Sequence, residues 1–171
     1  MGSGVRPDQN NFEGGRLILF QAITLDGQRI GTIALESLAG GRVGISACAL
    51  GVATAAYEEL FKAVHADPQP YHKATLARAY VRLSSARSLV ERAADAKDRG
   101  DPFVAEASAA KICASEAAVW IAGRAVDVLG ADAVRAGARA QRLLRDARVF
   151  PIVEGTTEIQ ELILARALLG S

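Results

Sequence analysis

The fold is decided by residues 102–130, which read PFVAEASAAKICASEAAVWIAGRAVDVLG. Apolar residues recur in this stretch every three or four positions, so they fall on one face of a helix. Pro102 suits the first turn of a helix, and Gly130 suits its C-terminal cap. The spacing predicts a long helix ending at residue 129. Its apolar stripe is formed by Phe103, Ala107, Ala110, Ala114, Ala117, Trp120, Ile121 and Val128.

Two further long helices are predicted before this one, over residues 33–64 and 71–98. The breaks between the helices are proline-containing segments, residues 67–70 and 99–102, which a helix does not readily continue through. Alanine is frequent in all three stretches, and only 5% of the residues are aromatic, a composition that favours closely packed helices over sheets.

A shorter helix is predicted over residues 135–148, followed by a loop and a last helix over residues 157–169. In that last helix, Thr157 and Gln160 have the spacing of a capping box. Several long helices with short connections predict an all-α fold. We therefore expect an antiparallel four-helix bundle with an extra short helix over residues 36–171.

The N-terminal residues show no such period. Residues 1–15 are rich in glycine, proline and asparagine and are expected to be a disordered lead. Residues 16–35 are expected to be a connecting segment, in which residues 17–20 and 30–33 could form a hairpin around the turn dipeptide Asp26-Gly27.

Length and charge limit the class of protein. The 171 residues fit one domain, and a net charge of +1 lacks the one-sign field typical of nucleic-acid or membrane binding. The apolar stretch over residues 43–57 is shorter than the about 20 residues that a bilayer requires. Without the pattern of a secretion signal near residue 1, a cytoplasmic protein with neither partner is expected.

Outside the last loop, no catalytic or metal-binding role is predicted for the histidines, cysteines or arginines. His65 and His72 flank a proline turn without a ligand pattern, so no metal site is predicted. Cys48 and Cys113 are expected to be small buried hydrophobes. The arginines at helical spacing are expected to form a solvated face, although an anion site is the alternative; they are Arg135, Arg139, Arg142, Arg145 and Arg148.

Two segments carry a family resemblance. Residues 145–160, RDARVFPIVEGTTEIQ, resemble the signature near the end of acyl-CoA dehydrogenases, and residues 38–51, LAGGRVGISACALG, resemble the first helix of that family's C-terminal bundle. The likeness extends over about residues 27–170. It implies the C-terminal helical domain of a flavin-dependent enzyme that removes hydrogens from the α and β carbons of an acyl-CoA, or acyl-carrier, thioester.

By this resemblance Glu154 is the catalytic base. The α-proton of a thioester is weakly acidic, so a positioned base and enolate stabilisation are both required. We expect this carboxylate at the mouth of a cleft between helices, where an apolar acyl chain would desolvate it. Some family members carry the base on the first bundle helix, but that position holds Gly41 here. The alternative is that Glu154 only complements the positive end of the last helix.

Other residues receive roles from the same resemblance. Arg42 and Gly155 match positions beside the substrate, although a lone arginine is more often a solvated or paired surface charge. Positions that contact the flavin in the family are matched by Thr156, Thr157 and Glu158, which could equally be helix-capping residues.

Departures from the family pattern concern FAD, the implied cofactor. A glycine-rich dinucleotide element is reduced here to Gly130, and it is flanked by Asp127 and Asp132, which would repel a pyrophosphate. We therefore expect this chain to need a flavin-domain partner chain or a homo-oligomer. The alternative is a non-catalytic assembly or regulatory module that keeps the bundle in order to associate.

Overall fold

The structure is a computed structural model that describes residues 27–135 and 137–170. The chain divides into two compact units, Met1–Glu36 and Ser37–Ser171. Of the first unit, residues 27–36 are described, and they are helical. The bundle and the candidate site lie in the second unit.

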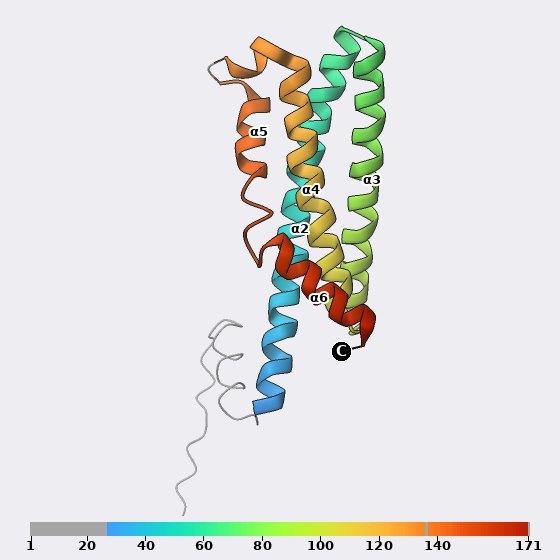
Figure 1. The fold of residues 1–171 in the computed structure, drawn as a ribbon, viewed down its shortest axis with the longest axis vertical. Coiled ribbons are helices and arrows are strands. Elements are labelled where there is room, and N and C mark those ends of the chain that lie inside the picture. Colours follow the sequence, from blue (N-terminus) through green and yellow to red (C-terminus); the bar gives the residue numbers. More distant parts are fainter. Residues whose placement is uncertain (1–26, 136, 171) are drawn as a thin grey trace, which may run out of the picture. The chain divides into compact units, whose positions relative to one another are not determined.

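The second unit is an antiparallel helical bundle, as predicted (Figure 1). In this unit the three helices after α2 run alternately down, up and down, while the last helix lies across α4. Residues 27–135 and 137–170 contain no strand. The elements in order are α2 (Gly27–Ala66), α3 (Pro70–Asp98), α4 (Val104–Leu129), the 3₁₀ helix η1 (Gly130–Val134), α5 (Arg139–Ala147) and α6 (Thr157–Leu169).

Most helix ends follow the predicted signals, but Pro102, expected in the first turn of the third long helix, lies before the Phe103 N-cap of α4, which begins at Val104. Pro70 lies in the first turn of α3, where its missing N–H leaves no hydrogen bond unmade. Gly130 caps α4 with a φ of 57°, a conformation that side-chain-bearing residues avoid. The final helix spans Thr157–Leu169, as predicted.

The core is built mainly from alanine. Because an alanine carries only a methyl group, helices that meet through it can approach closely, and the residue loses no side-chain entropy on burial. Larger side chains fill the remaining space at a few positions on several helices, among them Leu60, Leu83, Ile121 and Phe150. Trp120 packs against this core, as predicted, with the Arg82 guanidinium 4.7 Å from its ring centroid.

The predicted hairpin is wrong in its second strand, the one that the structure describes. Residues 30–33, predicted as a strand, lie inside α2, which begins at Gly27. No proline separates them from the long helix, and each added residue of a growing helix gains a hydrogen bond, so the helix extends through them. The other predicted strand, residues 17–20, and the lead over residues 1–15 lie outside the described residues.

Two local predictions near the end of the bundle are also corrected. The helix expected over residues 135–148 begins only at Arg139, because Gly137 adopts a φ of 83°, which an α-helix does not accommodate. The N-cap of α6 is Thr156 rather than Thr157, and no side-chain capping bond forms. The Gln160 side chain, predicted to close a capping box, bonds elsewhere.

The exposed face of α2 is mixed, with small residues toward its start and Glu58, Lys62 and His65 toward its end. By length and composition, Glu36–Ala66 is the one described segment able to cross a membrane, with a mean hydropathy of 1.4 and only 28% of its most apolar window buried. The core helix of a soluble protein passes the same test, and its inward positions such as Ala53 and Leu60 join the bundle core. Cys48, expected to be buried, is exposed on this helix, while Cys113 is half-buried.

Candidate active site

Glu154 lies in a tight turn between α5 and α6. Two consecutive residues adopt left-handed backbone conformations, Glu154 with a φ of 56° and Gly155 with a φ of 90°. Glu154 is the one non-glycine residue in the described ranges with a positive φ. Such a conformation costs about 1–3 kcal/mol and persists only where the surroundings enforce it, so the turn is held from outside.

The carboxylate of Glu154 lies over the start of the bundle segment of α2. A Cβ placed on Gly41 would come within 2.8 Å of Glu154 Oε2 and 3.2 Å of its carboxyl carbon. The missing side chain of Gly41 therefore leaves the space that the carboxylate occupies. The two positions at which the base is expected in different members of the resembled family, 154 and 41, converge here on one place.

The expected cleft is not closed around this group. Glu154 is exposed, so the bundle supplies a wall behind the carboxylate and leaves its other side open. That differs from the expectation of a carboxylate between helices. The physical reason is that the Glu154 side chain is exposed at the surface of the unit, with only the Gly41 side of the carboxylate in contact with a helix.

Arg42 lies beside the carboxylate and is buried, contrary to a solvated surface charge. Its Nε and Nη1 atoms have no hydrogen-bond partner among the described residues. Burial lowers the pKa of the Arg42 guanidinium, and the nearby negative charge of Glu154 opposes this shift. A buried polar group without a partner is rare in a native fold, so Arg42 is a candidate ligand-binding group.

Gln160 ties the turn to α4. Its side chain is fully buried, and Nε2 donates to the backbone oxygens of Glu154, at 3.0 Å, and Gly155, at 3.4 Å. Its Oε1 accepts a hydrogen bond from the Ser108 hydroxyl at 3.1 Å. The amide therefore connects the backbone of the site to the centre of the bundle.

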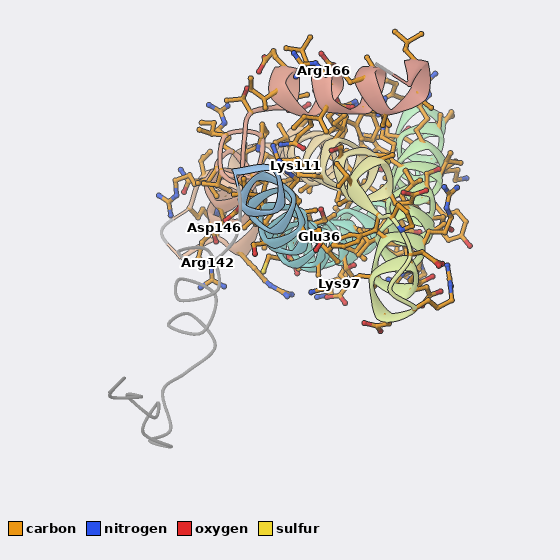
Figure 2. The ribbon with its side chains drawn as sticks, turned by 90° about the horizontal axis from the view of Figure 1, so that it is seen from below. Glu36, Lys97, Lys111, Arg142, Asp146 and Arg166 are labelled. Atoms are coloured by element: carbon orange, nitrogen blue, oxygen red, sulfur yellow. The ribbon has the colours of Figure 1, made fainter. Side chains whose placement is uncertain are left out.

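Lys111 holds the other end of the turn. Its side chain is fully buried, and Figure 2, a view along the bundle, places it among the helices. Nζ donates to the backbone oxygen of Pro151 at 3.1 Å. Burial lowers the pKa of Lys111, an effect opposed by Glu158 and reinforced by Arg42.

The residues predicted to contact a flavin lie at the start of α6. Thr156 is the N-cap, and its hydroxyl hydrogen-bonds the Glu158 carboxylate, which lowers the pKa of Glu158 together with a bond from its own backbone N–H. Thr157 borders an open hollow of about 340 Å³ that also includes Trp120 and Pro151. These three positions are compatible with a role at the start of the helix. Their contact with a flavin stays a prediction.

Gly155 was expected to be a glycine because it lies beside the substrate, but the structure gives another reason. A Cβ there would come within 2.5 Å of Gln160 Nε2, so the space is filled by the protein's own amide and not by open approach to a substrate. The positive φ adds a second requirement for glycine. Its predicted contact with substrate has to come through the backbone.

Sequence reasoning missed the three buried polar residues Ser108, Lys111 and Gln160. Lys111 and Ser108 interrupt the alanine-rich face of α4, and a charge on an apolar stripe is a usable signal. Gln160 gave no such signal because its spacing from Thr157 fits a capping box.

The described residues do not fit FAD by themselves. The segment assigned to the dinucleotide carries exposed carboxylates, with Asp127 paired to Arg124 at 2.8 Å and Asp132 to Arg135 at 3.1 Å. These acidic groups oppose a pyrophosphate, and the two arginines on this segment, Arg124 and Arg135, are already paired with them. Among the described residues, this segment therefore offers no free cation of its own to a dinucleotide phosphate.

The fold and the site define a class: an all-α bundle that presents one carboxylate from a clamped turn beside a buried arginine. The family model described as "Acyl-CoA dehydrogenase, C-terminal domain" matches residues 31–169, and the chain belongs to this family.

Named relatives agree with this assignment. The mitochondrial short-chain specific acyl-CoA dehydrogenase of Rattus norvegicus is 42% identical over 147 residues, covering 81% of this chain and 36% of that protein. An acyl-CoA dehydrogenase of Bacillus subtilis is 42% identical, with 81% and 38% covered. The structure of butyryl-CoA dehydrogenase from Megasphaera elsdenii has a TM-score of 0.76 at 34% identity, with 81% and 38% covered. The chain thus spans less than two-fifths of the length of these relatives.

Proposed function

We propose that this chain supplies the base-bearing domain of an acyl-CoA dehydrogenase, with Glu154 removing the α-proton of an acyl-CoA thioester. The observation that carries the proposal is the placement of the Glu154 carboxylate against Gly41, held by a turn in an enforced backbone conformation. An exposed surface glutamate has no need for such a constraint, whereas a base must be aimed at one carbon.

The open side of the carboxylate is where the thioester would lie. An acyl chain placed there would exclude water from Glu154 and make the carboxylate more basic than it is in solvent. For Arg42 to bind a polar group of the substrate, its guanidinium would have to be uncovered, because Nε and Nη1 are buried and have no partner in the described residues. Gly155 would contact the substrate through its backbone.

FAD enters this proposal only through the family, where it accepts the β-hydrogen of the substrate. Because the described residues do not fit it, the proposal assigns this chain the proton step and places the flavin on another chain or segment. Thr156, Thr157 and Glu158 are the candidates for contact with a flavin held in that way. The purified chain is accordingly expected to be colourless.

The proposal is tested by exchange of the α-proton with solvent. The chain is incubated with butyryl-CoA in D₂O, and α-deuterium is followed by mass spectrometry for the wild type, Glu154→Gln and a matched control, Glu161→Gln, on the exposed side of α6. We expect exchange above the buffer rate in the wild type and control, and a loss of about 10²–10⁴-fold in Glu154→Gln. Equal exchange in wild type and Glu154→Gln sinks the proposal.

A second candidate function, assembly without catalysis, is favoured by one observation. Two large apolar side chains of α2 are exposed, Leu38 at 50% and Phe61 at 49%, and apolar surface left open is often covered by a partner. Sedimentation of the purified chain separates the candidates: a monomer that does not self-associate removes homo-assembly and leaves the catalytic proposal standing.

A further inference from the structure

We propose that three buried side chains, here called the clamp, are positioning residues for Glu154. The clamp consists of Ser108, Lys111 and Gln160. It acts on the backbone of the turn and thereby fixes where the carboxylate lies. Its catalytic meaning rests on the proposed function, but its structural action is measurable without any reaction.

The first step of the argument concerns the backbone at Glu154. A left-handed glutamate is unfavourable by about 1–3 kcal/mol, so a free turn would leave this conformation. Gln160 Nε2 donates to the carbonyl oxygens of Glu154, at 3.0 Å, and Gly155, at 3.4 Å, which flank the Cα of Gly155. Both bonds are made with Glu154 and Gly155 at positive φ, so they favour the conformation that aims the carboxylate.

The second step concerns the direction of the amide. A glutamine side chain can present either its oxygen or its nitrogen, and only the nitrogen can donate to carbonyl groups. The two carbonyl oxygens of the turn can only accept, so they fix the nitrogen toward the turn and the oxygen toward α4, where the Ser108 hydroxyl donates to Oε1 at 3.1 Å. Since both residues are fully buried, water does not compete for these groups.

The third step concerns the entry to the turn. Lys111 Nζ donates to Pro151 O at 3.1 Å, and the same oxygen accepts from the Thr157 backbone N–H at 3.1 Å. One carbonyl therefore joins α4, the turn and the start of α6. None of the recorded hydrogen bonds of the clamp involves the Glu154 carboxylate, so the clamp leaves this group free to react.

The experiment is solution NMR on the full chain, with no substrate. The reporters are the nuclear Overhauser contact between Glu154 Hγ and Gly41 Hα, and the exchange rate of the Thr157 amide, which donates to Pro151 O. We compare Gln160→Met, which keeps the volume without the amide, and Ser108→Ala. The control is Ser115→Ala, because Ser115 is equally buried on α4 but its hydroxyl has no partner in the described residues.

We expect Gln160→Met to lose the Glu154–Gly41 contact and to speed the Thr157 amide exchange at least about 10-fold, with a smaller change in Ser108→Ala and none in Ser115→Ala. Gln160→Glu should lose the contact at neutral pH and regain it in acid, because only a protonated carboxyl can donate to the Glu154 carbonyl. If Gln160→Met does not fold, the Ser108→Ala variant tests the proposal. A Glu154–Gly41 contact and an amide exchange rate equal to those of Ser115→Ala would overturn the clamp.

The catalytic part is then measured by α-proton exchange of butyryl-CoA in the same variants, with a loss of about 10–100-fold expected in Gln160→Met. Loss in Glu154→Gln without any loss in Gln160→Met overturns the positioning role while the base assignment survives. Wild-type exchange in Glu154→Gln overturns the base assignment, and the NMR contact still decides whether the clamp fixes the carboxylate.

Discussion

The Glu154 carboxylate occupies the volume in which a side chain at Gly41 would begin, with 2.8 Å between Oε2 and an added Cβ. Residues 113 positions apart in the chain thus share one place, because α2 and the turn before α6 lie against each other. A side chain at position 41 would therefore begin where the Glu154 carboxylate ends. The empty position at 41 is as much a part of the site as the carboxylate at 154.

Gly41→Ala is expected to stabilise the bundle while displacing the base. Replacing a glycine inside a helix by alanine gains about 0.5–1 kcal/mol, and the flexible end of Glu154 can move away from the new methyl group. We expect a higher midpoint of chemical denaturation and slower α-proton exchange.

The matched control is Gly44→Ala on the same helix, where an added Cβ meets nothing within 4 Å. It should gain the same stability with unchanged exchange. Equal exchange in both variants would show that the carboxylate does not need the space at Gly41.

Gly155→Ala is expected to destabilise the unit and release the turn. Its φ of 90° is strained for any side chain, and the new Cβ would collide with the Gln160 amide. A loss of about 2–4 kcal/mol in the free energy of unfolding is expected from strain and broken hydrogen bonds together.

Gly100→Ala separates the two causes, because Gly100 has a φ of 73° with nothing near an added Cβ. It should lose only the strain energy of about 1 kcal/mol. If both variants lose the same amount, the contact with Gln160 contributes nothing.

Lys111 makes stability depend on pH in the alkaline range. Its folded pKa is lowered by burial from the ordinary value of 10.5, so between the two values the unfolded chain binds more protons than the folded one. The unfolding free energy therefore rises with pH through this window and is constant again above 10.5. Below the folded pKa, the cost of burying the charge is fully present.

Urea denaturation of wild type and Lys111→Met from pH 7 to 10.5 checks this prediction. The difference between the two proteins should shift in favour of the wild type as the pH rises, because Met cannot lose a proton. A difference independent of pH would mean that burial does not perturb the lysine.

Arg42→Met is expected to raise the free energy of unfolding and to weaken substrate binding. The buried guanidinium atoms without partners are unfavourable, and an apolar side chain of similar length should raise the free energy of unfolding by about 1 kcal/mol or more. The same change should weaken butyryl-CoA binding, measured by calorimetry. Arg87→Met, at an exposed position of α3, should change neither quantity; a less stable Arg42→Met would show that the guanidinium is satisfied in solution.

Much of the fold follows from local patterns. Residues 102–130 predict α4 because apolar spacing and end signals act within a few residues, and Gly130 caps the helix as expected. The start of α2 was missed because the strand pattern at residues 30–33 and the turn dipeptide before it are also compatible with a helix. Similarly, Gly137 has no local signal that distinguishes a tolerated helix glycine from one with a positive φ.

The sequence by itself determined the helices, their order, the family and the glutamate of the turn, because periodicity, caps and motifs depend on neighbouring residues. The tertiary structure alone decided that Gly41 faces Glu154, that Arg42 is buried, and that Gln160 binds the turn instead of capping a helix. These relationships join residues far apart in the chain, and packing alone sets the distances between them. The motif identifies the carboxylate, and the packing of the helices around it places that carboxylate where it can act as a base.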